Sequence, residues 1–130
     1  MIVVGYSADR YGTAALEHGI AEAKRRNTNL LVINATRGDS LADPRFAQSK
    51  EVHEVEERLN ECGVEFELAQ PVGVDAADEL LKAMEHDDAE LLVVGVRQRN
   101  PVGKLLLGSV ARQVLLECPK PVLAVKPEEL

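Results

Sequence analysis

The chain has 130 residues, of which 45% are hydrophobic and 28% charged, and this length suits one domain (1–130) with a core of its own. Its formal net charge of −7 argues against nonspecific nucleic-acid binding, because that function needs a broad basic surface. The first ten residues lack the basic start of a signal peptide and no apolar run reaches the length of a membrane span. We therefore expect a cytoplasmic protein that binds neither nucleic acid nor membrane.

Five strand-like runs alternate with four helical patterns along the chain. The expected strands are IVVGY from Ile2, NLLVINA from Asn29, VEFELA from Val64, ELLVVG from Glu90 and PVLAV from Pro121. Between them, apolar residues recur at helical spacing. The residues expected to face inward are Leu16, Ile20 and Ala23, then Val52, Val55, Leu59 and Cys62, then Ala77, Leu80, Leu81 and Met84, and finally Val110, Val114 and Leu115. This alternation is typical of an α/β fold, with a parallel sheet and helices on both faces.

Local signals place some of the helix ends and one sheet edge. Asp9 and Asp75 are the predicted N-caps of the first and third helices, and Gly63 is expected to end the second. The third strand alternates apolar residues with Glu65 and Glu67, so one of its faces meets water and we expect it at an edge. The fifth strand is apolar throughout, which fits a central strand or a covered edge. The segment 37–45 is predicted to be a mobile surface loop.

One segment, residues 95–115, carries four basic residues and no carboxylate although the chain as a whole is acidic. The four are Arg97, Arg99, Lys104 and Arg112. Gly108 and Ser109 fall where the fourth helix begins, and a helix N-terminus offers free N–H groups and the positive end of a dipole. These features predict a phosphate site beyond the carboxyl ends of the strands. The alternative is a solvated basic loop before an ordinary helix start.

No other residues indicate a catalytic or metal site. The three histidines fall on three different predicted helices: His18, His53 and His86. Cys62 and Cys118 have neither metal-ligand nor redox spacing, so we expect buried free thiols. Ser109 lacks a candidate base and a G-x-S-x-G motif. We therefore predict no metal ligand and no catalytic residue.

The chain resembles the universal stress protein family, single-domain α/β proteins whose ATP-binding members carry G-x2-G-x9-G-[ST] after strand four. The matching stretches are IVVGYSADRYGTAAL near the start, AELLVVG before the loop and GSVARQVLLECPKPVLAVK after it. Gly95, Gly108 and Ser109 stand at the family spacing. Gln98 replaces the second glycine, and Ser7 stands where ATP-binding relatives have an acidic residue that contacts the nucleoside. The Gln98 side chain either narrows the pocket or donates its amide to a phosphate.

The resemblance implies an adenine-nucleotide α-hydrolase-like (Rossmann-like) fold with a five-stranded parallel sheet of order 3-2-1-4-5. It implies a regulatory stress-response module, and not an enzyme, that binds ATP or AMP, with or without Mg²⁺, at the carboxyl ends of strands one and four. The implied binding residues are Gly5, Tyr6, Ser7, Ala35, Val94, Gly95, Arg97, Gln98, Gly108, Ser109 and Val110. It also supports a homodimer through the bare fifth strand, formed by Val122, Leu123, Ala124 and Val125.

Two other functions stay open at this point. A dimeric stress or signalling protein that binds no nucleotide and acts through its surface is favoured by Ser7 and Gln98. A slow ATP hydrolase or nucleotidyl-transfer enzyme would need a poised base or magnesium-binding carboxylates near the phosphates, and the basic segment contains none.

Overall fold

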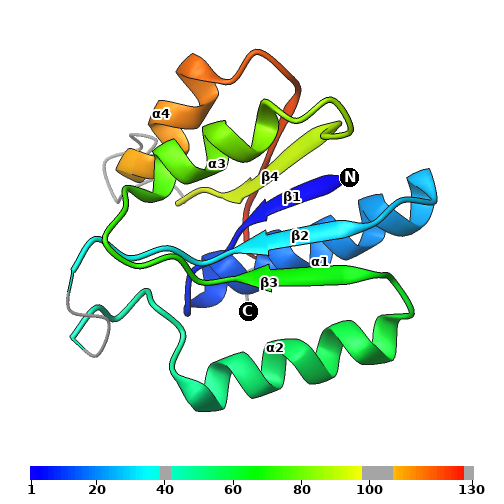
Figure 1. Ribbon diagram of the computed structural model, residues 1–130, viewed down its shortest axis with the longest axis horizontal. Coiled ribbons are helices and arrows are strands. Elements are labelled where there is room, and N and C mark those ends of the chain that lie inside the picture. The colour runs from blue at the N-terminus through cyan, green and yellow to red at the C-terminus, as the bar shows by residue number, and fades with distance from the viewer. Residues whose placement is uncertain (39–41, 98–106, 128–130) are drawn as a thin grey trace.

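The computed structural model describes residues 1–38, 42–97 and 107–127. Within these residues, strands and helices alternate as β1 (Ile2–Gly5), α1 (Arg10–Arg26), β2 (Leu30–Ile33), α2 (Ser49–Cys62), β3 (Phe66–Ala69), α3 (Ala76–Met84), β4 (Leu91–Gly95), α4 (Ser109–Glu117) and β5 (Val122–Val125). Every pair of neighbouring strands is parallel, and the order across the sheet is β3-β2-β1-β4-β5 (Figure 1). The predicted fold and strand order are confirmed.

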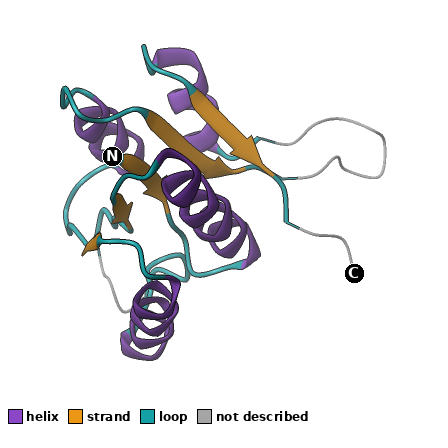
Figure 2. Cartoon of the chain, turned by 90° about the vertical axis from the view of Figure 1, so that its right-hand side faces the viewer, coloured by secondary structure: helices purple, strands orange, loops and turns teal. Residues whose placement is uncertain are grey.

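The helices form two layers, one on each face of the sheet (Figures 1 and 2). Helices α1 and α2 cover one face, and α3 and α4 cover the other. Successive strand residues point to opposite faces, so Ile2 and Val4 join the core under α1 whereas Val3 joins the core under α3. Both faces of the central strands are therefore buried in aliphatic side chains, as their continuous Val, Leu and Ile runs predicted.

The two edges of the sheet are β3 and β5. The edge position of β3 was predicted from its glutamates, and Glu67 is exposed. The apolar strand β5 is an edge and not a central strand. Ala124 on it is exposed, while Val125 is buried against the core. The homodimer through β5 stays a prediction.

The predicted helix ends are confirmed by hydrogen bonds and backbone angles. The Asp9 carboxylate accepts from the Gly12 N–H at 2.9 Å and caps α1, and Asp75 accepts from the Asp78 N–H at 3.1 Å and caps α3. Gly63 ends α2 with a φ of 75°, in the left-handed region that costs glycine little.

Five residues predicted to be buried are less so. Leu115 is 39% exposed, because α4 buries a narrow stripe made by Ala111 and Val114 and turns the next residue away. The other four are half-buried: Val52, Leu81, Val110 and Cys118. The prediction was wrong for Leu115 and too strong for the other four.

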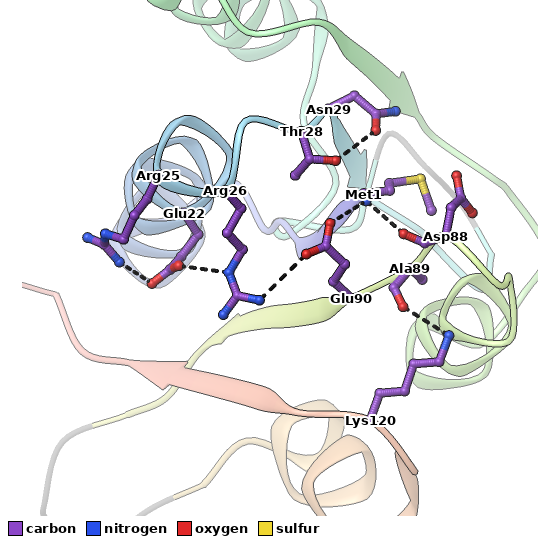
Figure 3. Close-up of polar contacts among 10 residues, drawn as sticks. All are labelled: Met1, Glu22, Arg25, Arg26, Thr28, Asn29, Asp88, Ala89, Glu90 and Lys120. Atoms are coloured by element: carbon purple, nitrogen blue, oxygen red, sulfur yellow. Dashed lines mark hydrogen bonds and ion pairs between the residues drawn. The ribbon is translucent and has the colours of Figure 1, made fainter.

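Polar contacts link the segments at the amino ends of the strands, on the side of the sheet opposite the carboxyl ends (Figure 3). The Lys120 ammonium group donates to the carbonyls of His86 at 2.6 Å and of Ala89 at 2.9 Å. The Met1 amino group donates to the Glu90 carboxylate at 3.1 Å. These bonds satisfy polar groups in the connection between α3 and β4.

Candidate functional site

A pocket of about 880 Å³ opens beyond the carboxyl ends of β1, β2 and β4. Its walls are the ends of these strands, the segment after β2 and the first residues of α3 and α4. Strands β1 and β4 lie where the direction of winding reverses, which is the usual position of a ligand in an open α/β sheet.

All the predicted site residues that the structure describes line this pocket. They are Gly5, Tyr6, Ser7, Ala35, Val94, Gly95, Arg97, Gly108, Ser109 and Val110. Gln98 lies outside the described residues, as do Arg99 and Lys104 of the basic segment. The structure thus brings together residues from four separate parts of the chain, and their role in binding stays a prediction.

The end of β1 contributes a linked hydroxyl and carboxylate. The Ser7 hydroxyl donates to Asp9 Oδ1 at 2.8 Å, and the same oxygen accepts the Gly12 N–H. Asp9 also lines the pocket, so it both caps α1 and puts a negative charge on this wall. The sequence predicted only the capping role, because a one-dimensional pattern cannot show that the cap borders a pocket.

Tyr6 lies beside this pair and its phenol stays protonated at neutral pH. Burial raises the pKa of Tyr6, and the negative charges of Glu51, Asp9 and Glu54 raise it further. The Tyr6 ring packs against the core under α1 and α2, and Glu51 and Glu54 belong to α2 and do not line the pocket.

Glycines at the site serve different purposes. A Cβ on Gly95 would lie 2.4 Å from the Tyr11 carbonyl oxygen, and one on Gly12 would lie 1.7 Å from the Ser7 carbonyl oxygen. Both are therefore needed for α1 to pack on the end of the sheet. A Cβ on Gly108 meets no described atom within 4 Å, and its φ of −63° suits any residue. The fold as described does not need glycine at this position.

The N-terminus of α4 borders the pocket without a capping hydrogen bond from any side chain that the structure describes. Asp9 and Asp75 cap α1 and α3, which also border the pocket, whereas Gly108 has no side chain to cap α4. No acidic residue lies in the first turn of α4. Its first N–H groups and its dipole therefore favour an anion, and Arg97 lines the same pocket.

The segment after β2 forms another wall, which sequence reasoning missed. The Thr36 hydroxyl donates to Asp43 at 2.7 Å and the Arg45 N–H donates to the same carboxylate at 3.0 Å, and these bonds lower the pKa of Asp43. Buried Asn34 binds the same segment. Hydrogen bonds thus hold the part of 37–45 that the structure describes, and the mobility expected for this segment stays a prediction. The only sequence signal was a polar residue, Asn34, directly after an apolar strand.

Arg37 joins this wall to α3. Its guanidinium group pairs with the Asp75 carboxylate, which raises the pKa of Arg37 and lowers that of Asp75. Asp75 therefore serves both the helix cap and this ion pair, and Arg37 is only partly available to an anionic ligand.

The described part of the chain offers neither a candidate metal cluster nor a candidate membrane helix. No group of three or more His, Cys, Asp or Glu side chains in it is arranged to hold a metal ion. None of the helices described is long and apolar enough to cross a membrane.

Comparison with known proteins gives consistent matches along the chain. The sequence model of the universal stress protein family matches residues 1–126. A universal stress protein of Mycolicibacterium smegmatis is 72% identical over 127 residues, which are 98% of this chain and 98% of the relative. The solved universal stress protein from Archaeoglobus fulgidus in complex with dAMP is 27% identical, with a TM-score of 0.64 and 96% of each chain covered. A universal stress protein solved in complex with cAMP is 26% identical, with a TM-score of 0.71, and the match covers 96% of this chain and 94% of that one.

The family match covers all five strands of the sheet, including the three strands that border the pocket. The similarity in sequence and the similarity in fold thus both extend over almost the whole chain. The chain belongs to the universal stress protein family.

Proposed function

We propose that the protein is a cytoplasmic stress-response module that binds an adenine nucleotide, ATP or AMP, in the pocket at the ends of β1 and β4. The observation that carries the proposal is the N-terminus of α4, which no described side chain caps and which borders a pocket of about 880 Å³. That volume is in the range of about 300–1,000 Å³ common for small-molecule sites. The relatives in complex with dAMP and cAMP support an adenine nucleotide as the ligand.

Charge decides the orientation of the nucleotide in this proposal. The carboxylates of Asp9, Asp43 and Asp75 border the pocket on the sides of β1, β2 and α3, and they repel phosphates. The α4 end carries no carboxylate in its first turn, so the phosphates lie there. The proposed phosphate-binding residues are Gly95, Arg97, Gln98, Gly108, Ser109 and Val110. Adenine and ribose lie toward Gly5, Tyr6, Ser7, Ala35 and Val94.

The carboxylates of the pocket favour binding over catalysis. Asp9 and Asp75 are occupied as helix caps, and Asp43 is held by Thr36. Hydrogen bonds lower the pKa values of Asp43 and Asp75, which makes these groups weaker general bases at neutral pH. The protein then acts through its nucleotide-bound state, with or without Mg²⁺ on the phosphates.

A second candidate function is a dimer that acts through its surface and needs no nucleotide. It is favoured by the open β5 edge and by Leu116, which is 75% exposed on α4. The Ser7 hydroxyl, which already donates to Asp9, also favours it, since this hydroxyl has no second proton to give a ligand.

Acid extraction of the purified protein, followed by chromatography of the extract, tests for bound nucleotide. Calorimetry with ATP, AMP and GTP then measures affinity and base preference. Ser109→Ala is expected to lose about 0.5–1.5 kcal/mol of ATP binding. Ser49→Ala is the matched control, because Ser49 begins α2 as Ser109 begins α4 but does not line the pocket. An empty extract together with no detectable ATP or AMP binding would refute the proposal and favour the surface-acting dimer.

A further inference from the structure

We propose that Asn34 is a positioning residue, which holds the segment 42–47 against the sheet so that one wall of the nucleotide pocket is formed before any ligand arrives. The consequence for nucleotide affinity rests on the proposed function, whereas the docking of the wall rests on the hydrogen bonds alone. Asn34 follows β2 and is 1% exposed, so its amide has no access to water and must find its partners within the protein.

The side chain of Asn34 links three parts of the chain. Its amide nitrogen donates to the Tyr6 carbonyl, just after β1, at 2.9 Å and to the Arg45 carbonyl at 3.0 Å. Its amide oxygen accepts the Ala47 N–H at 2.7 Å and the Gln70 side-chain amide at 3.1 Å. Two donors and two acceptor positions are thus all used, which is the full capacity of an asparagine side chain.

Two further hydrogen bonds hold the segment 42–47, one from a residue after β3 and one from a residue after β1. The Gln70 amide also donates to the Ala47 carbonyl at 3.0 Å, and the Ala8 N–H donates to the Arg45 carbonyl at 2.9 Å. Residues 42–45 of the segment line the pocket, facing the end of β1. The wall is therefore attached to the ends of β1, β2 and β3 through a small group of bonds centred on Asn34.

This arrangement affects binding through preorganisation. A wall that is already docked costs the ligand no conformational entropy on binding, whereas a detached wall must be ordered at the expense of affinity. Removing the donors of Asn34 leaves the Tyr6 and Arg45 carbonyls without this partner and so favours the detached state.

Asn34→Asp is the sharpest variant, because it keeps the shape and the acceptor for Ala47 but replaces the two donated bonds with a carboxylate facing two carbonyl oxygens. Gln70→Leu removes the second fastening and provides an independent variant if the first does not fold. Ile20→Ala is the matched control. Ile20 is a buried residue of α1 and does not line the pocket, so its truncation is expected to lower global stability without touching the wall.

Amide hydrogen exchange measures the docking of the wall directly. In Asn34→Asp, and in Gln70→Leu, exchange at the Ala8 and Ala47 amides is expected to rise at least about tenfold more than exchange in β4. In Ile20→Ala the β4 amides should gain at least as much as these two. Equal gains at the wall and in β4 for both wall variants would overturn the proposal, and so would unchanged exchange at Ala8 and Ala47.

Calorimetry with ATP measures whether the docked wall affects nucleotide affinity. Asn34→Asp is expected to bind ATP at least about tenfold more weakly, and Ile20→Ala within about threefold of the natural chain. Lowering the pH from about 8 to about 6 should restore part of the affinity of Asn34→Asp, because a protonated carboxyl regains one donor. If the wall loosens while ATP affinity stays unchanged, the wall does not shape the site. If the unsubstituted chain binds no ATP, the proposed function fails and the exchange result alone decides the docking role.

Discussion

Replacing Gly108 by valine separates folding from ligand binding more cleanly than any other change at the pocket. A Cβ there meets no described atom within 4 Å, and the backbone angles of −63° and 156° are open to valine. Valine is a poorer N-cap than glycine, but it also restricts the unfolded chain, and these two effects are each below about 1 kcal/mol and opposite in sign. We expect the free energy of unfolding to change by less than about 0.5 kcal/mol, or about 2 °C in Tm.

ATP binding should respond very differently to Gly108→Val. If the phosphates lie against the first N–H groups of α4, the valine methyl groups stand between them and the backbone. Losing one charge-assisted hydrogen bond costs about 1.5–3 kcal/mol, which is about a 10- to 150-fold loss of affinity. Gly108→Ala should fall between valine and the natural glycine.

Thermal melting without ligand and calorimetry with ATP check the two halves of this prediction on the same samples. Unchanged ATP affinity in Gly108→Val would mean that the phosphates lie elsewhere. A fall of many degrees in Tm without ligand would mean that the glycine is structural and that the reasoning from its open surroundings is wrong.

Three further predictions concern other parts of the chain. Gln98→Gly is expected to tighten ATP binding if the glutamine side chain narrows the pocket; a measured loss of affinity would instead identify its amide as a ligand. Ala124→Lys is expected to split the proposed β5 homodimer in sedimentation while the monomer stays folded, because Ala124 is exposed whereas Val125 on the same strand is buried; an unmodified chain that sediments as a monomer at micromolar concentration would contradict the dimer. The Thr36 hydroxyl first and the Arg45 N–H second lower the pKa of Asp43, so these bonds stabilise the fold above the pKa of the unfolded carboxyl, near 4, and this stabilisation is lost as the pH falls through the lower folded pKa. Denaturant unfolding of Asp43→Asn at several pH values should show a weaker dependence of stability on acid. A pH profile identical to that of the natural chain would show that the bonds to Asp43 add no stability.

Much of the fold was predictable because its signals are local. The glutamates at 65 and 67 mark β3 as an edge, and Gly63 ends α2 in the left-handed conformation. The caps of α1 and α3 follow from Asp9 and Asp75, whose short side chains reach the N–H groups of the first turn. Each of these choices depends on a few neighbouring residues, so the sequence alone contains the physical reason.

The parts that sequence reasoning missed depend on contacts between distant segments. Whether Leu115 faces inward depends on how α4 is rotated over α3 and the sheet, and a helical pattern allows either of two neighbouring faces. The wall held by Asn34 depends on where the ends of β1 and β3 come to lie. The pocket residues were found mainly through the family resemblance, because no local pattern identifies a site made from four separate segments.

The central position of β1 has a consequence for the order in which the molecule can assemble. Ile2 of β1 pairs with Leu30 of β2 on one side and with Leu91 of β4 on the other. The first strand to be synthesised therefore obtains its second partner only from a strand late in the chain. While the protein is being synthesised, β1, α1 and β2 can pack early, but the second edge of β1 stays bare until β4 has left the ribosome. Helix α1 packs against both β1 and β4, and Gly95 on β4 is what lets it sit so close. The pairing of β4 with β1 joins segments that are far apart in the sequence. We expect this pairing to limit the folding rate and to set the time during which a nascent chain is exposed to aggregation.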